Sequence, residues 1–383
     1  MDTLGDPAGE KMKIGIDCRE LRAYITGIGR ILLEFLREAR RHRKDFDFTL
    51  FGNQLTDFSS FPDVFEDYRK VILREKLTLW WDQIQLKNAI AKNNIDVFFS
   101  PYYKIPLLSK TKTILSIFDV TYLLVEPYRS SWRNKFYIKN FIQLASRKAK
   151  RIITSSHWTK SDLLKGLHLP EEKIEVIYLG VNPKFQAILE KNKRDYIKKK
   201  YRIQKRYLLY VGNFLPHKNV KSLIAAYNLL PENIRREYSL VLGGGRPKGF
   251  KQDIEQSGLS DSQSIIYCGD IVDEDLPALY SGAELFVFPS LYEGFGLPPV
   301  EAMACGCPVA SSHASSLPEI LGNAALFFNP YQVEEISKTV KLILENKDLR
   351  ENLRQKGLER AKLFASARTA EKLTAIFKTA YES

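Results

Sequence analysis

Residues 284–319 read ELFVFPSLYEGFGLPPVEAMACGCPVASSHASSLPE, and this stretch decides the fold of the chain. It opens on an apolar run short enough for a buried strand, and a second such run begins at Val309. Between them, Pro298 and Pro299 suit the first turn of a helix, and Gly306 suits the position just past its end. The order strand, loop, helix, strand predicts an open α/β sheet, in which ligands bind where the strands end.

The loop of this stretch combines groups that suit phosphate with groups that suit hydroxyls. Glycines leave N–H groups unshielded, and the start of a helix attracts anions. Glu293 in the loop and Glu301, expected in the first turn of the helix, would repel a phosphate but can accept hydrogen bonds from hydroxyls. Phosphate together with hydroxyls describes a nucleotide sugar. The amides available to the phosphate belong to Gly294, Phe295, Gly296 and Leu297.

At these residues the chain resembles a known family, the retaining glycosyltransferases of the GT-B fold with an E-x7-E motif (family 4 type). Glu293 and Glu301 match the two acids of the motif, and EGFGLP matches its loop. The resemblance extends from about Lys13 to the C-terminus and is weaker in the first half. It implies two Rossmann-like, doubly wound α/β domains that face a central crevice.

Length and composition are typical of a globular protein with two domains. The chain has 383 residues, enough for two domains, and its 44% hydrophobic and 27% charged content is typical of globular proteins. No apolar run approaches the length of a membrane-spanning helix. The net charge of +13 favours anionic partners without choosing among them. The four cysteines are scattered and the five histidines do not cluster, so we expect a reducing compartment and no metal site.

Alternation of apolar runs and helical segments predicts the domain organisation. We expect a disordered leader without a signal peptide over 1–12, and an N-terminal acceptor domain over 13–179. A C-terminal nucleotide-sugar-binding domain is expected over 180–366. The resemblance implies that the final helix, 367–383, returns to the first domain.

Two loops of the first domain are candidates for the crevice. Gly27 and Gly29 follow the first strand and open a helix, where the family has a glycine-rich loop near the donor phosphates and the acceptor. Asp119 ends a later strand and should point into the crevice. Many relatives have His before this Asp, whereas this chain has Phe118, which weakens any claim that a histidine assists catalysis.

The second domain supplies the remaining donor-binding candidates. Gly212, Asn213 and Lys218 follow its first strand, and Lys218 is expected to open the next helix, where a cation invites an anionic ligand. The family often has Arg where Asn213 stands, so one phosphate-binding cation is missing, and Arg246 is a candidate substitute. The resemblance places backbone near Val272 against the nucleobase.

Three further segments allow two interpretations each. The acidic run 273–275 resembles a metal-binding D-x-D sequence but is more typical of a helix cap. The Trp pair in 76–85 is expected in the core, with a role in acceptor binding as the alternative. The basic runs 37–44, 133–139 and 147–151 suit either a solvated helix face or an anionic lipid surface.

The predicted function is transfer of a hexose from a nucleotide-diphosphate sugar to a glycan or lipid-linked acceptor in cell-surface polysaccharide synthesis. We expect Glu293, Lys218 and Asp119 to be catalytic, with Lys218 and the loop amides stabilising the leaving diphosphate. The resemblance implies that Glu293 holds donor-sugar hydroxyls and Glu301 the ribose hydroxyls. It implies no metal or other cofactor beyond the donor, GDP-mannose or a UDP-sugar, with mannose favoured weakly.

The expected location is the cytoplasm, with the inner face of the membrane as an alternative position, and no nucleic acid is expected as partner. The alternatives are a nucleotide-sugar epimerase of the same architecture, a basic protein that binds nucleotides or nucleic acid, and a catalytically inert sugar-nucleotide sensor.

Overall fold

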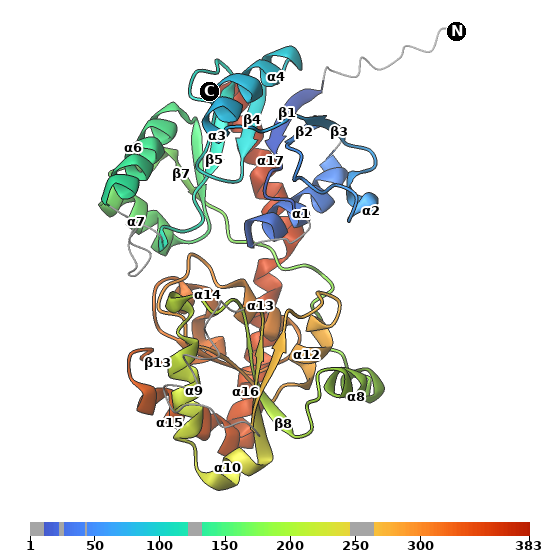
Figure 1. Cartoon of the computed structure of the whole chain (residues 1–383), viewed down its shortest axis with the longest axis vertical. Coiled ribbons are helices and arrows are strands. Elements are labelled where there is room, and N and C mark those ends of the chain that lie inside the picture. Colours follow the sequence, from blue (N-terminus) through green and yellow to red (C-terminus); the bar gives the residue numbers. More distant parts are fainter. Residues whose placement is uncertain (1–10, 23–26, 43, 122–131, 246–263) are drawn as a thin grey trace.

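The computed structural model describes residues 11–22, 27–42, 44–121, 132–245 and 264–383 (Figure 1). Within these residues the chain forms two layered α/β domains, one above the other along the long axis. All of the paired strands run parallel, and the inner strands of both sheets are mainly buried, whereas the four edge strands are less buried. A parallel sheet with both faces covered buries its inner strands in this way.

The first domain is built on a sheet whose strand order is β3-β2-β1-β4-β5-β6-β7. Its strands are β1 (Met12–Asp17), β2 (Phe46–Gly52), β3 (Arg69–Ile72), β4 (Val97–Ser100), β5 (Lys112–Ser116), β6 (Arg151–Thr154) and β7 (Ile174–Val176). Its helices are α1 (Gly27–Ala39), α2 (Pro62–Phe65), α3 (Thr78–Trp80), α4 (Leu86–Lys92), α6 (Trp132–Lys148) and α7 (His157–Leu167).

The second domain repeats the plan with the strand order β10-β9-β8-β11-β12-β13. Its strands are β8 (Arg206–Val211), β9 (Tyr238–Gly243), β10 (Ile265–Gly269), β11 (Leu285–Phe288), β12 (Val309–Ser312) and β13 (Ala325–Phe328). Its helices are α8 (Lys191–Lys200), α9 (Val220–Asn228), α10 (Glu232–Glu237), α12 (Leu276–Gly282), α13 (Leu297–Ala304), α14 (Leu317–Leu321), α15 (Val333–Glu345) and α16 (Lys347–Ala361).

Strand β1 shows how the first sheet is packed on both faces. Ile14 and Ile16 are fully buried in a cluster with side chains of α1 and of the last helix, α17 (Ser366–Glu382). Gly15 faces the other side, where an added Cβ would lie 2.8 Å from the ring of Phe51. Glycine is therefore needed here for the close approach of an aromatic ring from β2.

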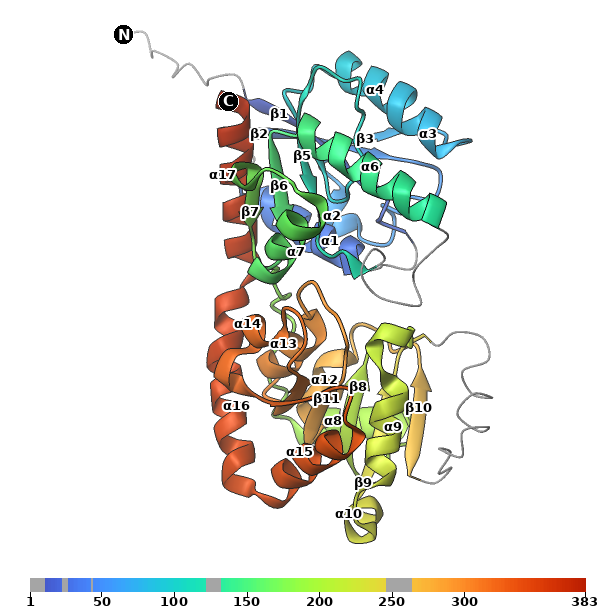
Figure 2. The same cartoon turned by 90° about the vertical axis from the view of Figure 1, so that its left-hand side faces the viewer.

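The last two long helices join the domains along one side of the molecule (Figure 2). Helix α16 packs on the second domain, and α17 then continues beside the first domain. Phe377 of α17 is fully buried, with its ring centroid 5.9 Å from that of Phe35 in α1. Apolar burial of this kind fastens the C-terminal segment to the first domain.

Several sequence predictions need correction. Met12 is the first residue of β1 and pairs with Phe46, so the first strand begins one residue before the expected domain bound at residue 13. The segment with the Trp pair contains a π-helical turn, Trp81–Gln85, and only one of the two tryptophans is in the core: Trp81 is fully buried, whereas Trp80 is 55% exposed. Helix α7 begins three residues after the end of β6, and the side chain of its N-cap residue, Ser156, accepts from the N–H of Thr159.

Candidate active site

Each sheet has one topological switch point, the place where the strand order reverses. In the first sheet the strand order reverses between β1 and β4, and in the second between β8 and β11. Strands β8 and β11 are neighbours, with Leu208 opposite Leu285, so the loops that follow them lie side by side. One loop carries Lys218 and the other Glu293. Loops at the carboxyl ends of strands at a switch point are where α/β sheets bind ligands.

Lys218 and Glu293 form an ion pair at this point. Lys218 Nζ donates to Glu293 Oε1 at 2.6 Å, and the two side chains are only 15% and 12% exposed. The backbone of Glu293 is fixed as well, because its N–H donates to Ser315 Oγ and its carbonyl accepts from Ser316 Oγ. The sequence placed these two residues in one site, and the structure adds that they contact each other directly.

The loop after β8 differs in detail from its prediction. Lys218 does not open helix α9 but ends a 3-10 turn, Pro216–Lys218, two residues earlier. Asn219 follows with a left-handed φ of 56°, and its side-chain amide donates to the carbonyls of Pro289 and Pro330. These bonds tie the loop to the neighbouring strands. Lys218 is therefore held by its loop and by Glu293, not by the end of a helix.

The other residues predicted in this loop have distinct environments. Asn213 is exposed, and its carbonyl accepts a hydrogen bond from Tyr210 Oη at 2.7 Å. Gly212 packs against Gly244, where an added Cβ would lie 2.0 Å from the Gly212 carbonyl. Gly244 also has a φ of +124°, so glycine is required there twice over. Arg246 lies outside the described residues.

Buried His217 completes the loop. Its carbonyl accepts from the N–H of Leu291 at 2.7 Å, which links the loops after β8 and β11 once more. Burial and the positive charge of Lys218 together lower the pKa of His217 from 6.5 to about 4, against the opposing charge of Glu293. The imidazole is therefore neutral at physiological pH.

Glu301, the second acid of the motif, is deeply buried. It is the fifth residue of α13, so the prediction that it lies in the first turn is wrong. Gly296 precedes the helix with a φ of +91°, and Leu297 is its first residue. Glu301 is 6% exposed and accepts from Tyr280 Oη at 3.1 Å, and Arg30 Nη1 lies 3.7 Å from its Oε1.

The ionisation of Glu301 reflects these neighbours. Burial raises the pKa of Glu301, while the charge of Arg30 and the hydrogen bond from Tyr280 lower it. Arg30 belongs to α1 of the first domain, so a residue of one domain reaches the acid of the other.

The loop after β11 is also wedged against the first domain. A Cβ added to Gly294 would lie 1.9 Å from the Phe118 carbonyl and 2.8 Å from Asp119 Cβ. The Gly294 carbonyl accepts from Ser155 Oγ at 2.9 Å and from Thr159 Oγ1 at 3.3 Å. The sequence offered this glycine as an exposed amide, but the structure gives it a second requirement, the close approach of two domains.

Further contacts between the domains surround this loop and were not predicted. Tyr292 Oη donates to Asp162 Oδ2 at 2.6 Å. Glu319 of α14 accepts from the backbone N–H groups of His157 and Trp158 at the start of α7. A carboxylate at a helix N-terminus satisfies unpaired donors and the helix dipole. No sequence pattern pairs an acid with a helix end 160 residues away.

Asp119 faces the ion pair from the first domain. Its Oδ1 accepts from the N–H of Thr121 at 3.0 Å, and its side chain stays exposed to water between the domains. Partial removal from water between the two domains raises the pKa of Asp119. The negative charge of Glu293 raises it as well, whereas the positive charge of Lys218 opposes the shift. Asp119, Glu293 and Lys218 are therefore electrostatically coupled across the crevice.

The remaining candidates lie at the start of α1 and just before α12. Gly27 is exposed at the first position of α1, where an added Cβ would meet nothing within 4 Å, and Gly29 is buried. Residue 26 of the same motif lies outside the described residues. Val272 is 49% exposed, and its N–H lies 3.4 Å from Tyr201 Oη.

The acidic run before α12 is not a helix cap in the predicted sense. Asp275 occupies the N-cap position, but its carboxylate accepts from Lys200 Nζ and Tyr201 Oη instead of from its own helix. Asp273 pairs with Arg30 at 2.6 Å and with Lys184. Among the described residues, no group of three or more His, Cys, Asp or Glu side chains could hold a metal ion.

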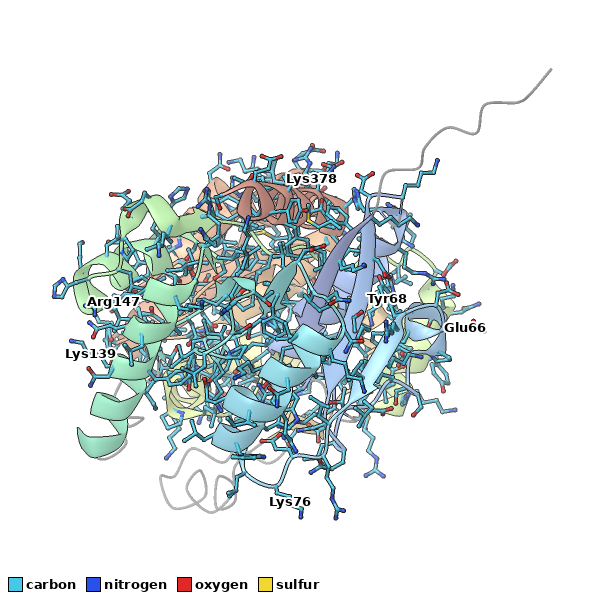
Figure 3. The ribbon with its side chains drawn as sticks, turned by 90° about the horizontal axis from the view of Figure 1, so that it is seen from above. Glu66, Tyr68, Lys76, Lys139, Arg147 and Lys378 are labelled. Carbon is cyan, nitrogen blue, oxygen red and sulfur yellow. The ribbon has the colours of Figure 1, made fainter. Side chains whose placement is uncertain are left out.

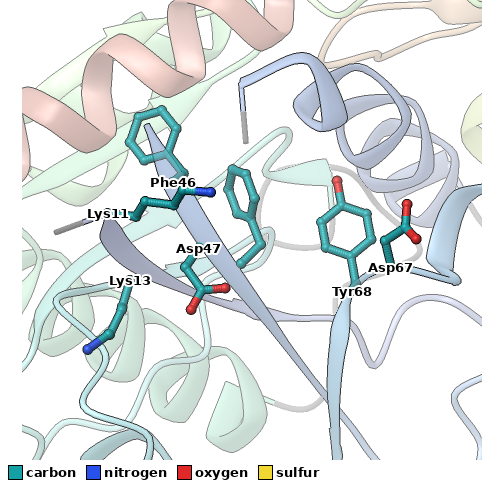
Figure 4. A pocket seen from close by; sticks show the side chains of 7 residues that line it. Lys11, Lys13, Phe46, Asp47, Asp67 and Tyr68 are labelled. Atoms are coloured by element: carbon teal, nitrogen blue, oxygen red, sulfur yellow. The ribbon is translucent and has the colours of Figure 1, made fainter. Parts of the chain in front are cut away.

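One cavity lies away from the Lys218–Glu293 pair. It has a volume of about 390 Å³ and lies at the opposite, N-terminal ends of β1 and β2 (Figure 4). Its lining mixes two lysines with two aspartates, so their charges cancel and give no preference for an anion. The lining residues are Lys11, Lys13, Phe46, Asp47, Phe48, Asp67 and Tyr68.

Comparison with known proteins identifies the family. Residues 25–185 match the family described as Glycosyltransferase Family 4, and residues 193–360 match the family described as Glycosyl transferases group 1. The chain belongs to glycosyltransferase family 4. The two matches fall one in each sheet domain, so the family assignment covers both halves of the crevice.

Two curated relatives of this glycosyltransferase are named as O-antigen chain mannosyltransferases. It is 29% identical to O-antigen chain mannosyltransferase B of Escherichia coli, over 92% of this chain and 96% of that protein. It is 30% identical to O-antigen chain mannosyltransferase RfbU of Salmonella typhimurium, over 68% of each. A crystal structure of HepE from Anabaena with UDP and glucose superimposes with a TM-score of 0.75 at 18% identity, over 96% and 100% of the two chains.

The predicted fold class and enzyme class are confirmed: the protein is a glycosyltransferase with the GT-B fold. The epimerase alternative is not supported, because the family and the named relatives are glycosyltransferases. Within the described residues, no helix combines the length and apolar character needed to cross a bilayer.

Proposed function

We propose that this glycosyltransferase transfers mannose, with retention of anomeric configuration, from GDP-mannose to a growing cell-surface glycan. The observation that carries the proposal is the Lys218–Glu293 pair at the β8–β11 switch point, opposite Asp119. The names of the two O-antigen mannosyltransferases support mannose as the sugar. Because the HepE structure holds UDP, the nucleobase of the donor, guanine or uracil, is the first property to test.

When the nucleotide sugar binds, Lys218 and Glu293 could each exchange the other for a group of the ligand. A diphosphate would replace Glu293 as the partner of Lys218, and sugar hydroxyls would replace Lys218 as donors to Glu293. Each charged group would then keep a partner in a site that is largely shielded from water. Negative charge grows on the diphosphate as the glycosidic bond breaks, so Lys218 would stabilise the transition state more than the ground state.

The other candidates would complete the donor site around this pair. Glu301 would accept hydrogen bonds from the ribose hydroxyls, and backbone near Val272 would contact the base. Asp119 would face the transferred sugar from the first domain. The backbone of Gly27 and Gly29 would lie near the phosphates, where the N-terminus of α1 favours negative charge.

The experiment has a binding arm and a turnover arm. Thermal unfolding is measured with GDP, UDP, GDP-mannose and UDP-glucose, and we expect the guanine nucleotides to raise Tm most. GDP release from GDP-mannose is then followed with octyl α-mannobioside as acceptor. We expect Glu293→Ala and Lys218→Ala each to reduce turnover by a factor of at least about 100. The matched controls are Lys341→Ala and Glu345→Ala, an exposed i,i+4 pair on α15.

The proposal fails at separate points. A rise in Tm with uridine nucleotides alone would show that the donor carries uracil and not guanine. Near-normal turnover in Glu293→Ala would refute the assignment of the site. Loss of turnover in the α15 controls would show that the assay responds to stability and not to the site.

We further propose that the acceptor is lipid-linked and that the first domain rests on anionic lipid at the inner face of the membrane. Exposed basic residues of α6 include Lys139 and Arg147, and Lys76 precedes the exposed Trp80 (Figure 3). Lys and Arg beside exposed apolar side chains suit an interface with anionic headgroups. Cosedimentation with phosphatidylcholine vesicles, with and without phosphatidylglycerol, tests this. Binding that ignores phosphatidylglycerol would contradict it.

A further inference from the structure

The contact between Arg30 and Glu301 crosses from one domain to the other. Arg30 is the fourth residue of α1, and its guanidinium is fixed by Asp273, whose Oδ1 lies 2.6 Å from Arg30 Nη2. Arg30 Nη1 lies 3.7 Å from Glu301 Oε1. This second distance is too long for a hydrogen bond but short enough for a charge interaction between the partly exposed guanidinium and the buried carboxylate.

The geometry leaves the acceptor capacity of Glu301 largely free. A carboxylate has about four lone-pair positions, and one is used by Tyr280 Oη at 3.1 Å. Arg30 is held by Asp273, so it supplies positive charge without occupying those positions. A buried carboxylate of this kind can accept two vicinal hydroxyls, provided that it stays ionised.

We propose that Arg30 is a positioning residue for nucleotide recognition, which keeps Glu301 in the carboxylate form that the ribose hydroxyls of the donor require. This rests on the proposed function, in which Glu301 binds the ribose. Because Arg30 belongs to the first domain and Glu301 to the second, tight donor binding then depends on the two domains being together.

The surroundings of Glu301 support this role. Arg30 of α1 and Lys184 of the linker between the domains contribute positive charge, and Asp273 contributes negative charge. Tyr280 of α12 donates a hydrogen bond, and Cys305 lies at the end of the helix that carries Glu301. Lys184 pairs with Asp273, so Arg30 is the cation within 4 Å of Glu301 in the described part of the chain.

The test measures GDP binding by titration calorimetry from pH 6 to 8.5, with UDP in its place if the panel selects uridine nucleotides. For Arg30→Gln we expect a Kd about tenfold above that of the wild type at pH 6, approaching the wild type at pH 8.5. Loss of the positive charge makes Glu301 hold its proton to a higher pH, so binding weakens as pH falls. Arg30→Lys should restore the wild-type profile within threefold.

Two controls separate this inference from the proposed function. Arg37→Gln, on the same helix and paired with Glu34 within its own domain, should leave the Kd unchanged. Glu301→Gln should bind GDP weakly at every pH. If Glu301→Gln binds like the wild type, the proposed donor site is wrong.

If Glu301→Gln is weak while Arg30→Gln matches the wild type at every pH, the proposed site stands and the role of Arg30 is refuted. A Kd for Arg30→Gln that is raised equally at all pH values would also refute it, because it would show a merely structural tie.

Discussion

Gly294→Ala should separate the domains at the point where the active-site loop meets the first domain. The new Cβ would lie 1.9 Å from the Phe118 carbonyl oxygen. A carbon–oxygen contact needs about 3.3 Å, so the two backbones must move apart by roughly 1.4 Å. Both partners are backbone, so no side chain can rotate away to absorb the clash.

The expected loss follows from this displacement. A shift of about 1 Å in a catalytic arrangement can cost about 100-fold in rate. Moving the loop also strains the bonds from Ser155 and Thr159 to the Gly294 carbonyl, which contribute roughly 0.5–1.5 kcal/mol each. We therefore expect kcat/KM to fall about 100-fold while each domain stays folded.

The assay is GDP release from GDP-mannose with octyl α-mannobioside, together with circular dichroism to confirm folding. Gly166→Ala is the matched control, because the same change on α7 meets nothing within 4 Å. Turnover of Gly294→Ala within threefold of the wild type would refute the reasoning. So would an equal loss in Gly166→Ala.

Three further predictions test other parts of the site. As pH falls from about 6.5 to about 4, the unfolded chain takes up a proton that folded His217 does not, so the free energy of unfolding falls by up to about 3 kcal/mol. Guanidinium unfolding curves should show this fall in the free energy of unfolding in the wild type but not in His217→Asn. Equal pH dependence of that free energy in the two proteins would contradict the prediction. Glu319→Ala removes the cap of α7 and should lower kcat/KM about three- to tenfold without loss of fold, whereas Glu335→Ala, which removes a bond within the second domain, should not. Excess EDTA should leave the rate within twofold, because Lys218 and backbone amides supply the positive charge; a larger loss restored by Mg²⁺ would show that a metal takes part.

Much of the fold could be predicted because local signals agree with the global plan. Short apolar runs such as the one that became β11 are typical of buried strands, and the glycine after α13 marks its end with a φ of +72°. The sites of Lys218 and Glu293 followed from the rule that α/β sheets bind ligands where their strands end. Their direct pairing did not follow, because it depends on β8 and β11 being neighbours in the sheet.

The sequence by itself determined the family, the two-domain α/β architecture and which loops carry the acids, glycines and lysine. These properties are encoded in residue type and short spacing. Only the tertiary structure decided that Gly294 is needed between domains, that Glu319 caps α7, and that Arg30 reaches Glu301. Each of these joins residues more than 150 positions apart. Such contacts are set by how two separately encoded domains meet, and no local pattern in the chain records that.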